Sequence, residues 1–173
     1  RNLLLTAIIL SLVPLSLIAP HIITAGAVPQ IHDISTDTDN PPTFDAVVAL
    51  REGAANDLIY GTVTLSPEQH AELQHEAYPQ IQTKLSPLTV LAAVSRAESI
   101  LAGQGLQIVS VNPEAGLVEA TATTFWFGFK DDLVVRIGTS DNGSKVDVRS
   151  VSRVGGSDLG ANAARIERFL LAF

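Results

Sequence analysis

The last third of the chain, residues 106–173, repeats a pattern of short apolar stretches separated by turn residues. Within it, Glu119, Thr121 and Thr123 alternate with small apolar residues, which is the period-two pattern of a β-strand. Asp141-Asn142-Gly143 is a strong hairpin signal. Sequential strands joined by short turns pair antiparallel, so we expect a four-stranded antiparallel meander. Its expected strands are residues 106–111, 117–127, 132–137 and 145–154.

Two amphipathic helices flank these strands. The first is expected to open at Ser86-Pro87 and to stop at Gly103 and Gly105. The second is expected to be capped by Ser157. Its expected buried stripe is Leu159, Ala163, Ile166, Leu170 and Phe173. Two helices covering the apolar face of a sheet make an α+β two-layer sandwich.

Composition divides the chain into three parts. Residues 1–27 are nearly all apolar, residues 28–87 form an acidic part with a short helix after Ser66-Pro67, and residues 88–173 form the α-β4-α module. The acidic part carries nine acidic and two basic residues. Residues 28–173 are long enough for one domain with its own core. Within the acidic part, residues 44–50 and 80–85 are expected as short strands.

The apolar run Leu3–Ala27 is just long enough to cross a bilayer. Arg1 precedes the run and acidic residues follow it, which predicts an N-terminus inside and the folded domain on the extracytoplasmic, periplasmic side. A cleaved signal peptide is the alternative, because Ala25-Gly26-Ala27 fits the small-x-small cleavage pattern. Both interpretations place the domain outside the cytoplasm.

Composition also excludes several functions. The chain has no cysteine, which excludes disulfides, thiolate metal sites and a cysteine nucleophile. Its net charge of −7 disfavours nucleic-acid binding. No phosphate-binding loop, dinucleotide fingerprint or nucleophile elbow occurs. We expect no metal and no cofactor.

Three arginines of the module form the first candidate site. Arg149 and Arg153 share one side of their strand with Asp147, and Arg136 shares a side of the preceding strand with Asp132. If these faces coincide, the charges lie on the solvent side of the sheet and pair across strands. Alternatively, the face continues into Gly155, Gly156 and Ser157, where a helix N-terminus could bind an anionic headgroup.

Four aromatic residues, Phe125, Trp126, Phe127 and Phe129, form the second candidate. Adjacent strand residues point to opposite faces, so at least one of Trp126 and Phe127 is expected on a surface. Core packing with a covered loop is one interpretation. A surface for a lipid-like ligand or a partner protein is the other.

A third candidate is the cluster His32, Asp33, Asp37 and Asp39. The spacing of Asp37 and Asp39 is similar to that of calcium loops, but the glycine and the distant glutamate of such a loop are missing. The other use of this cluster is catalytic. A hydrolase-like enzyme would need His32 and an acid to converge with Arg149 or Arg153 in a concave pocket.

Four runs of the sequence carry a family resemblance: IHDISTDTDNPPTF, AYPQI, EATATTFWFGFKDDLVVRI and VDVRSVSRVGGSDLGANAARI. Together they resemble the domain of unknown function 1499 family over nearly all of residues 31–173. The resemblance implies a bacterial or plastid protein, often preceded by membrane helices, and it implies no particular reaction. Two hypotheses follow: a membrane-anchored, non-catalytic binding module for a partner protein or an amphiphilic or anionic ligand, or an enzyme of unrecognised type.

Overall fold

The computed structural model describes residues 10–12, 27–62 and 64–173. The hydrophobic helix expected at the N-terminus falls almost entirely outside these residues. Within the described part of the chain, no helix combines the length and the apolar character needed to cross a membrane.

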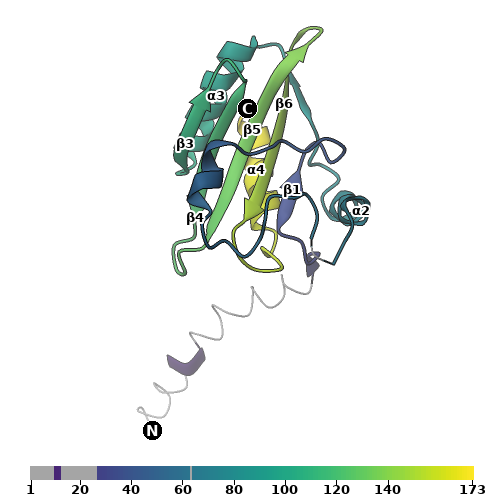
Figure 1. The fold of residues 1–173 in the computed structure, drawn as a ribbon, viewed down its shortest axis with the longest axis vertical. Coiled ribbons are helices and arrows are strands. Elements are labelled where there is room, and N and C mark those ends of the chain that lie inside the picture. The colour runs from purple at the N-terminus through teal and green to yellow at the C-terminus, as the bar shows by residue number, and fades with distance from the viewer. Residues whose placement is uncertain (1–9, 13–26, 63) are drawn as a thin grey trace.

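One antiparallel sheet of six strands organises the described residues (Figure 1). Its order is β1-β6-β5-β4-β3, and β2 pairs with β6 beside β1. The strands are β1 (Asp33–Ser35), β2 (Lys84–Ser86), β3 (Gln107–Asn112), β4 (Leu117–Thr123), β5 (Lys130–Ser140) and β6 (Gly143–Ser152). The chain is α+β, as predicted.

The expected count of four strands is wrong because the acidic part contributes two more. β1 pairs with residues 149–151 of β6, and β2 pairs with residues 144–146. Each of these strands has only three residues: β2 overlaps the end of the short strand expected at residues 80–85, whereas β1 is too short for alternation to be recognised in the sequence. The acidic part and the C-terminal module therefore share one sheet.

Helices α3 (Val90–Gly103) and α4 (Ala161–Ala172) cover one face of the sheet, and Figure 1 shows α4 behind β5 and β6. The core lies between these helices and the apolar side of β4, β5 and β6, where Leu101, Leu133 and Phe169 are fully buried. This half of the molecule is the helix-covered layer that the sequence predicts.

Both helices begin later than expected. Ser86 belongs to β2, and Thr89 caps α3 by accepting a hydrogen bond from the Ala92 N–H. Gly160, with φ of +81°, precedes α4 in place of a capping Ser157. The Asp158 carboxylate accepts the N–H groups of Gly160 and Asn162 instead. Leu159 is 40% exposed, so it does not belong to the buried stripe of α4.

The opposite face of the sheet is also covered, which the sequence analysis did not predict. Residues 36–61, here called the covering segment, cross this face, and in Figure 1 they pass in front of β5 and β6. They contain the 3-10 helix η1 (Ala46–Leu50), where a short strand was expected. Val134 and Val151 of the sheet and Val47 of η1 are fully buried. The placement of the charged face on the solvent side was therefore wrong.

Helix α2 (Pro67–Ala77) begins as predicted at Ser66, which forms a capping box with Gln69. The helix lies beside β1 and completes its outer edge. The Gln74 side chain accepts the Ser35 N–H at 2.9 Å and donates to the Ser35 carbonyl at 2.7 Å. His70 bonds the Asp33 carbonyl at 2.6 Å. Side chains thus replace a neighbouring strand at this edge.

The edge contacts generate a stability prediction. Gln74→Leu keeps a similar volume but leaves the N–H and carbonyl of Ser35 without their partners. Because each unsatisfied buried group costs about 1–3 kcal/mol, we expect the free energy of unfolding to fall by about 2–4 kcal/mol in urea denaturation of the full chain. Glu76→Leu, at an exposed position of the same helix, is the control and should change it by less than about 0.5 kcal/mol. Equal effects of both substitutions would contradict this account of the edge.

Candidate functional site

Arg149 of β6 lies at the centre of the charged sheet face. Its Nε and Nη2 donate to the two carboxylate oxygens of Asp33 at 2.9 and 2.6 Å. β1 and β6 are adjacent strands, so this bidentate pair joins neighbouring strands of the sheet. Asp33 is fully buried and Arg149 is 2% exposed. The pair is an internal ion pair rather than a surface one.

The covering segment accepts two further hydrogen bonds from Arg149. Nη1 donates to the Pro42 carbonyl at 3.2 Å and Nη2 to the Leu58 carbonyl at 2.8 Å. The guanidinium carbon lies 5.4 Å from the centre of the Phe44 ring and 5.6 Å from that of Tyr60. Arg149 therefore binds the sheet and the covering segment together.

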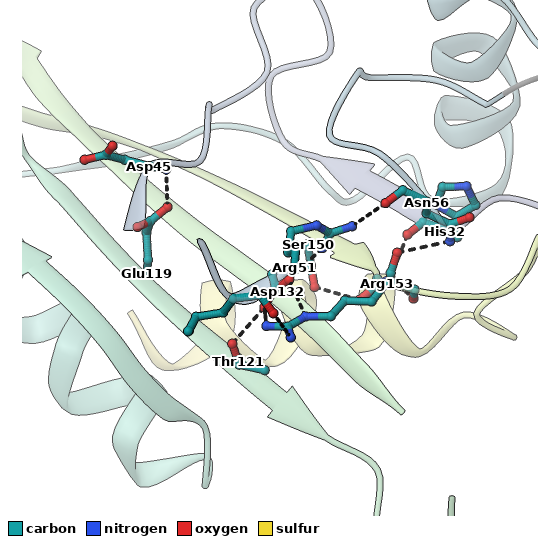
Figure 2. A network of polar contacts seen from close by, with 12 residues as sticks. His32, Asp45, Arg51, Asn56, Glu119, Thr121, Asp132, Ser150 and Arg153 are labelled. Atoms are coloured by element: carbon teal, nitrogen blue, oxygen red, sulfur yellow. Dashed lines mark hydrogen bonds and ion pairs between the residues drawn. The ribbon is translucent and has the colours of Figure 1, made fainter. Parts of the chain in front are cut away.

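Asp132 of β5 forms a second ion-pair centre, shown in Figure 2, in which Arg51 and Arg153 converge on its carboxylate. Arg51 donates at 2.6 Å, and Arg153 donates through two nitrogens at 2.9 and 2.8 Å. Thr121 of β4 donates at 2.7 Å. Burial raises the pKa of Asp132, but the hydrogen bonds from Arg153, Thr121 and Arg51 and the charge of Arg153 outweigh it, so the pKa is lowered.

Glu119 of β4 binds the start of η1. Its two carboxylate oxygens accept the N–H groups of Asp45 and Ala46, both at 2.6 Å, and Figure 2 shows Asp45 beside Glu119. The first N–H groups of a helix have no partner within the helix, so a carboxylate stabilises them. Arg153 also donates to the carbonyl of Leu50 at the other end of η1. Sheet side chains thus contact both ends of this helix.

Arg136 belongs to a third, less buried group. Its Nη2 lies 3.0 Å from both Asp37 and Asp147, and Lys145 bonds Asp37 at 3.1 Å. Burial raises the pKa of Asp37, but the Asn40 N–H, the Lys145 ammonium and Arg136 together lower it. Asp37 and Lys145 line an open hollow of about 580 Å³ whose wall also includes Asp39 and His75.

The helix-covered face holds a polar cluster that the sequence analysis missed. Arg165 of α4 bonds Asp131 at 2.8 Å, and its Nη1 donates to Ser150 and Asn162. Asn162 also donates to the carbonyl of His32 at 2.9 Å. The position of Arg165 inside the amphipathic pattern of α4, next to Ile166, was the one available signal. These bonds fix α4 against β5, β6 and the start of β1.

The His32 cluster does not assemble into one site. Asp33 pairs with Arg149, Asp37 pairs with Arg136 and Lys145, and Asp39 is exposed. His32 is 8% exposed, and its Nδ1 has no hydrogen-bond partner. His32 does not line the hollow that contains Asp37 and Asp39, and Asp33, Arg149 and Arg153 are bonded to partners other than His32, so these side chains do not converge as a hydrolase needs. The described residues also contain no group of three or more histidine and acidic side chains suited to a metal ion.

His70 of α2 is a buried histidine. It is fully buried, and its ring lies edge-on to Tyr60 with centres 4.9 Å apart. Burial lowers the pKa of His70, against the opposing influence of the Asp33 carbonyl and carboxylate. Its bond to the backbone of β1 gives it a structural role.

The aromatic residues lie on a surface loop, residues 124–129, here called the aromatic loop. β4 ends at Thr123, four residues before the expected end of that strand. The exposed fractions are 88% for Phe125, 84% for Trp126, 77% for Phe127 and 51% for Phe129. Core packing of these rings, one of the two interpretations of the sequence, was wrong.

Ser157 and Arg153 do not form the anion site that was expected at a helix N-terminus. Ser157 accepts the Leu159 N–H within its own turn and does not begin α4. Arg153, expected just before a helix N-terminus, points into the sheet face, where Asp132 and the carbonyl of Leu50 take its donors. The arginine face thus binds the chain's own carboxylates and carbonyls. Among the predicted ligand-binding residues Arg136, Arg149, Arg153, Ser157 and Trp126, only Trp126 is mostly exposed.

Comparison with protein families places this arrangement in a known class of domain. The family model described as "Protein of unknown function (DUF1499)" matches residues 33–173. The chain belongs to this family, as the resemblance implied. A comparison with curated proteins found no match. The matched region contains all six strands, the covering segment and the aromatic loop.

Replacing Arg149 tests its structural role. Arg149→Met leaves the carboxylate of Asp33 buried and unpaired, so we expect a loss of about 3–5 kcal/mol in the free energy of unfolding. Adding Asp33→Asn should restore part of this loss, because the two positions interact directly. Arg168→Met, at an exposed position of α4, is the control. Urea denaturation followed by circular dichroism measures all four proteins. A stable Arg149→Met protein, equal to the control, would show that Arg149 does not secure the fold.

The lowered pKa of Asp132 predicts acid sensitivity. The unfolded chain binds a proton at Asp132 near the ordinary carboxyl pKa of 3.8, while the folded chain binds it only at lower pH. Stability from this group is therefore present above pH 3.8 and is lost as the pH falls through the folded-state pKa. We expect Asp132→Asn to be less stable at pH 7 and to lose less stability on acidification. Asp141→Asn in the β5–β6 turn should follow the unmodified chain. Parallel curves for Asp132→Asn and the unmodified chain between pH 5 and pH 2 would contradict the assignment.

Proposed function

We propose that this domain is a non-catalytic binding module that docks an amphiphilic ligand or a partner protein through the aromatic loop. The observation that carries the proposal is the exposure of four aromatic side chains, Phe125, Trp126, Phe127 and Phe129, on one short loop. Large exposed apolar patches on a soluble domain mark interaction surfaces. Aromatic side chains are also the residues most enriched in the cores of interfaces.

The charged sheet face supports a binding module rather than an enzyme. Arg149 and Asp132, the two centres of that face, are at most 2% exposed and are hydrogen-bonded to partners within the chain. A substrate reaching them would have to displace the covering segment. Its removal would take Arg51 away from Asp132 and would take two carbonyl acceptors away from Arg149, so hydrogen bonds of buried charged groups would be lost. We therefore assign the arginine face a structural role and the aromatic loop the binding role.

We further propose that the module is anchored in a membrane by the apolar run Leu3–Ala27, with the folded domain on the extracytoplasmic side. This part of the proposal rests on the length of the run and on the charges that flank it. A tethered binding module needs no strong affinity of its own, because the tether raises the effective concentration of anything in the same membrane.

Site-specific photocrosslinking in cells tests the binding role of the loop. The photoreactive residue p-benzoylphenylalanine replaces Phe127, which it resembles in shape. A matched control carries it at Leu171 on α4, where the exposed fraction is 80% against 77% for Phe127. We expect a light-dependent adduct of defined mass from position 127 and none from position 171. No adduct at 127, or the same adducts at both positions, would overturn the proposal.

A further inference from the structure

The aromatic loop is internally hydrogen-bonded. Thr124 makes three of its bonds: its N–H donates to the Phe129 carbonyl at 2.8 Å, its carbonyl accepts the Gly128 N–H at 3.0 Å, and its Oγ1 accepts the Phe129 N–H at 2.9 Å. Gly128 adopts a φ of +64°, which a glycine reaches without steric cost. The loop therefore presents its rings on a defined turn.

The rings of the loop contact one another in pairs. Phe125 and Trp126 lie edge to face with centres 5.0 Å apart, and Phe127 and Phe129 stack with centres 5.5 Å apart. All four side chains are at least half exposed. Leaving them in water costs free energy at roughly 25 cal/mol per Å² of apolar surface, so a partner that buries them gains that amount.

The aromatic loop lies at the same end of the sheet as the N-terminal start of the folded domain. At this end Lys130 follows the loop, and its carbonyl accepts the Arg153 N–H at 2.9 Å. The start of β1 lies at this end too, because the Ser152 N–H at the end of β6 donates to the His32 carbonyl at 3.0 Å. Figure 1 shows the loop between β4 and β5 and the start of the folded domain near residue 27 at this same lower end. Two strand spacings, about 10 Å, separate β5 from β1 across the sheet.

This placement argues for one occupant over the others. The apolar run Leu3–Ala27 ends at the residue where the folded domain starts, so a bilayer holding that run would lie against the end of the sheet that carries the aromatic loop. Tryptophan and phenylalanine prefer the boundary between headgroups and acyl chains. Exposed Lys130, beside the loop, places a cation at the level of lipid phosphates.

From these observations we infer that the aromatic loop inserts into the headgroup region of a phospholipid bilayer, the one that holds residues 3–27. The inference rests on the proposed function and names the partner of the same loop. Insertion gives the domain a second attachment beside its tether. The long axis of the sheet then stands away from the membrane surface, with the β5–β6 turn pointing outward.

Trp126 is the only tryptophan of the chain, so its fluorescence reports the environment of the loop directly. The full chain is reconstituted into vesicles of phosphatidylcholine and phosphatidylglycerol. A second preparation uses phosphatidylcholine brominated on its acyl chains. We expect Trp126 emission at short wavelength, strong loss of intensity with brominated lipid and protection from acrylamide, a water-soluble quencher.

A control protein moves the reporter to another surface. Trp126→Phe combined with Leu171→Trp places the only tryptophan near the end of α4, at a position that is 80% exposed. Its emission should resemble that of tryptophan in water and be quenched by acrylamide. Phe127→Ser combined with Phe129→Ser keeps Trp126 as the reporter and should weaken quenching by the brominated lipid.

The inference is overturned if Trp126 in vesicles emits like the control tryptophan and is quenched by acrylamide but not by brominated lipid. If position 127 nevertheless crosslinks to a protein in cells, the binding module remains and its partner is that protein. If both measurements are negative, the proposed function and the lipid inference fail together. Quenching of both reporters by brominated lipid would also overturn the inference, because the domain would then lie on the membrane without using the loop.

Discussion

The rest of this structure depends on buried ion pairs between the sheet and the covering segment. Arg149 joins β6 to Asp33 of β1 and to two carbonyls of the covering segment, and Asp132 receives Arg51 from that same segment. Buried charges are tolerated only when they are paired and hydrogen-bonded, so each pair fixes both of its partners in place. Glu119 also fixes the orientation of η1, because its carboxylate accepts the backbone N–H groups of Asp45 and Ala46. A six-stranded sheet covered on both faces follows from these contacts.

This arrangement changes where a function should be sought. The sequence predicted that the arginines and aspartates of two neighbouring strands lie on the solvent side of the sheet, either pairing across strands or leading into an anion site at a helix N-terminus. Because the covering segment lies over this face, its charged residues are buried and form a polar core. The aromatic rings of residues 124–129, which are 51–88% exposed, remain accessible for binding. The charged residues therefore account for the fold, and the aromatic residues are the stronger candidates for the function.

Local sequence patterns predicted the elements whose contacts are local. The β5–β6 hairpin follows from Asp141-Asn142-Gly143, and α2 follows from its capping box. The covering segment could not be predicted, because its contacts join residues far apart in the sequence: Arg51 and Asp132 are separated by 81 positions, and Pro42 and Arg149 by 107. Trp126 was recognised as a candidate because adjacent strand residues cannot share a face. The exposure of the whole loop could not be predicted, because the alternating pattern of the sequence indicated a strand that continues to Phe127.

The most direct test of this account is native-state hydrogen exchange of the covering segment against the sheet beneath it. The informative amides are those of Asp45, Ala46 and Asn56, which bond to Glu119 and to the carbonyl of Arg153. The reference is the buried Ile137 of β5, whose N–H donates to the Gly116 carbonyl and not to the covering segment. If the charged face is a core, all four amides exchange with the same opening free energy, that of global unfolding. Much faster exchange in the covering segment, with Ile137 still protected, would show a separable lid over a binding site and would contradict the account.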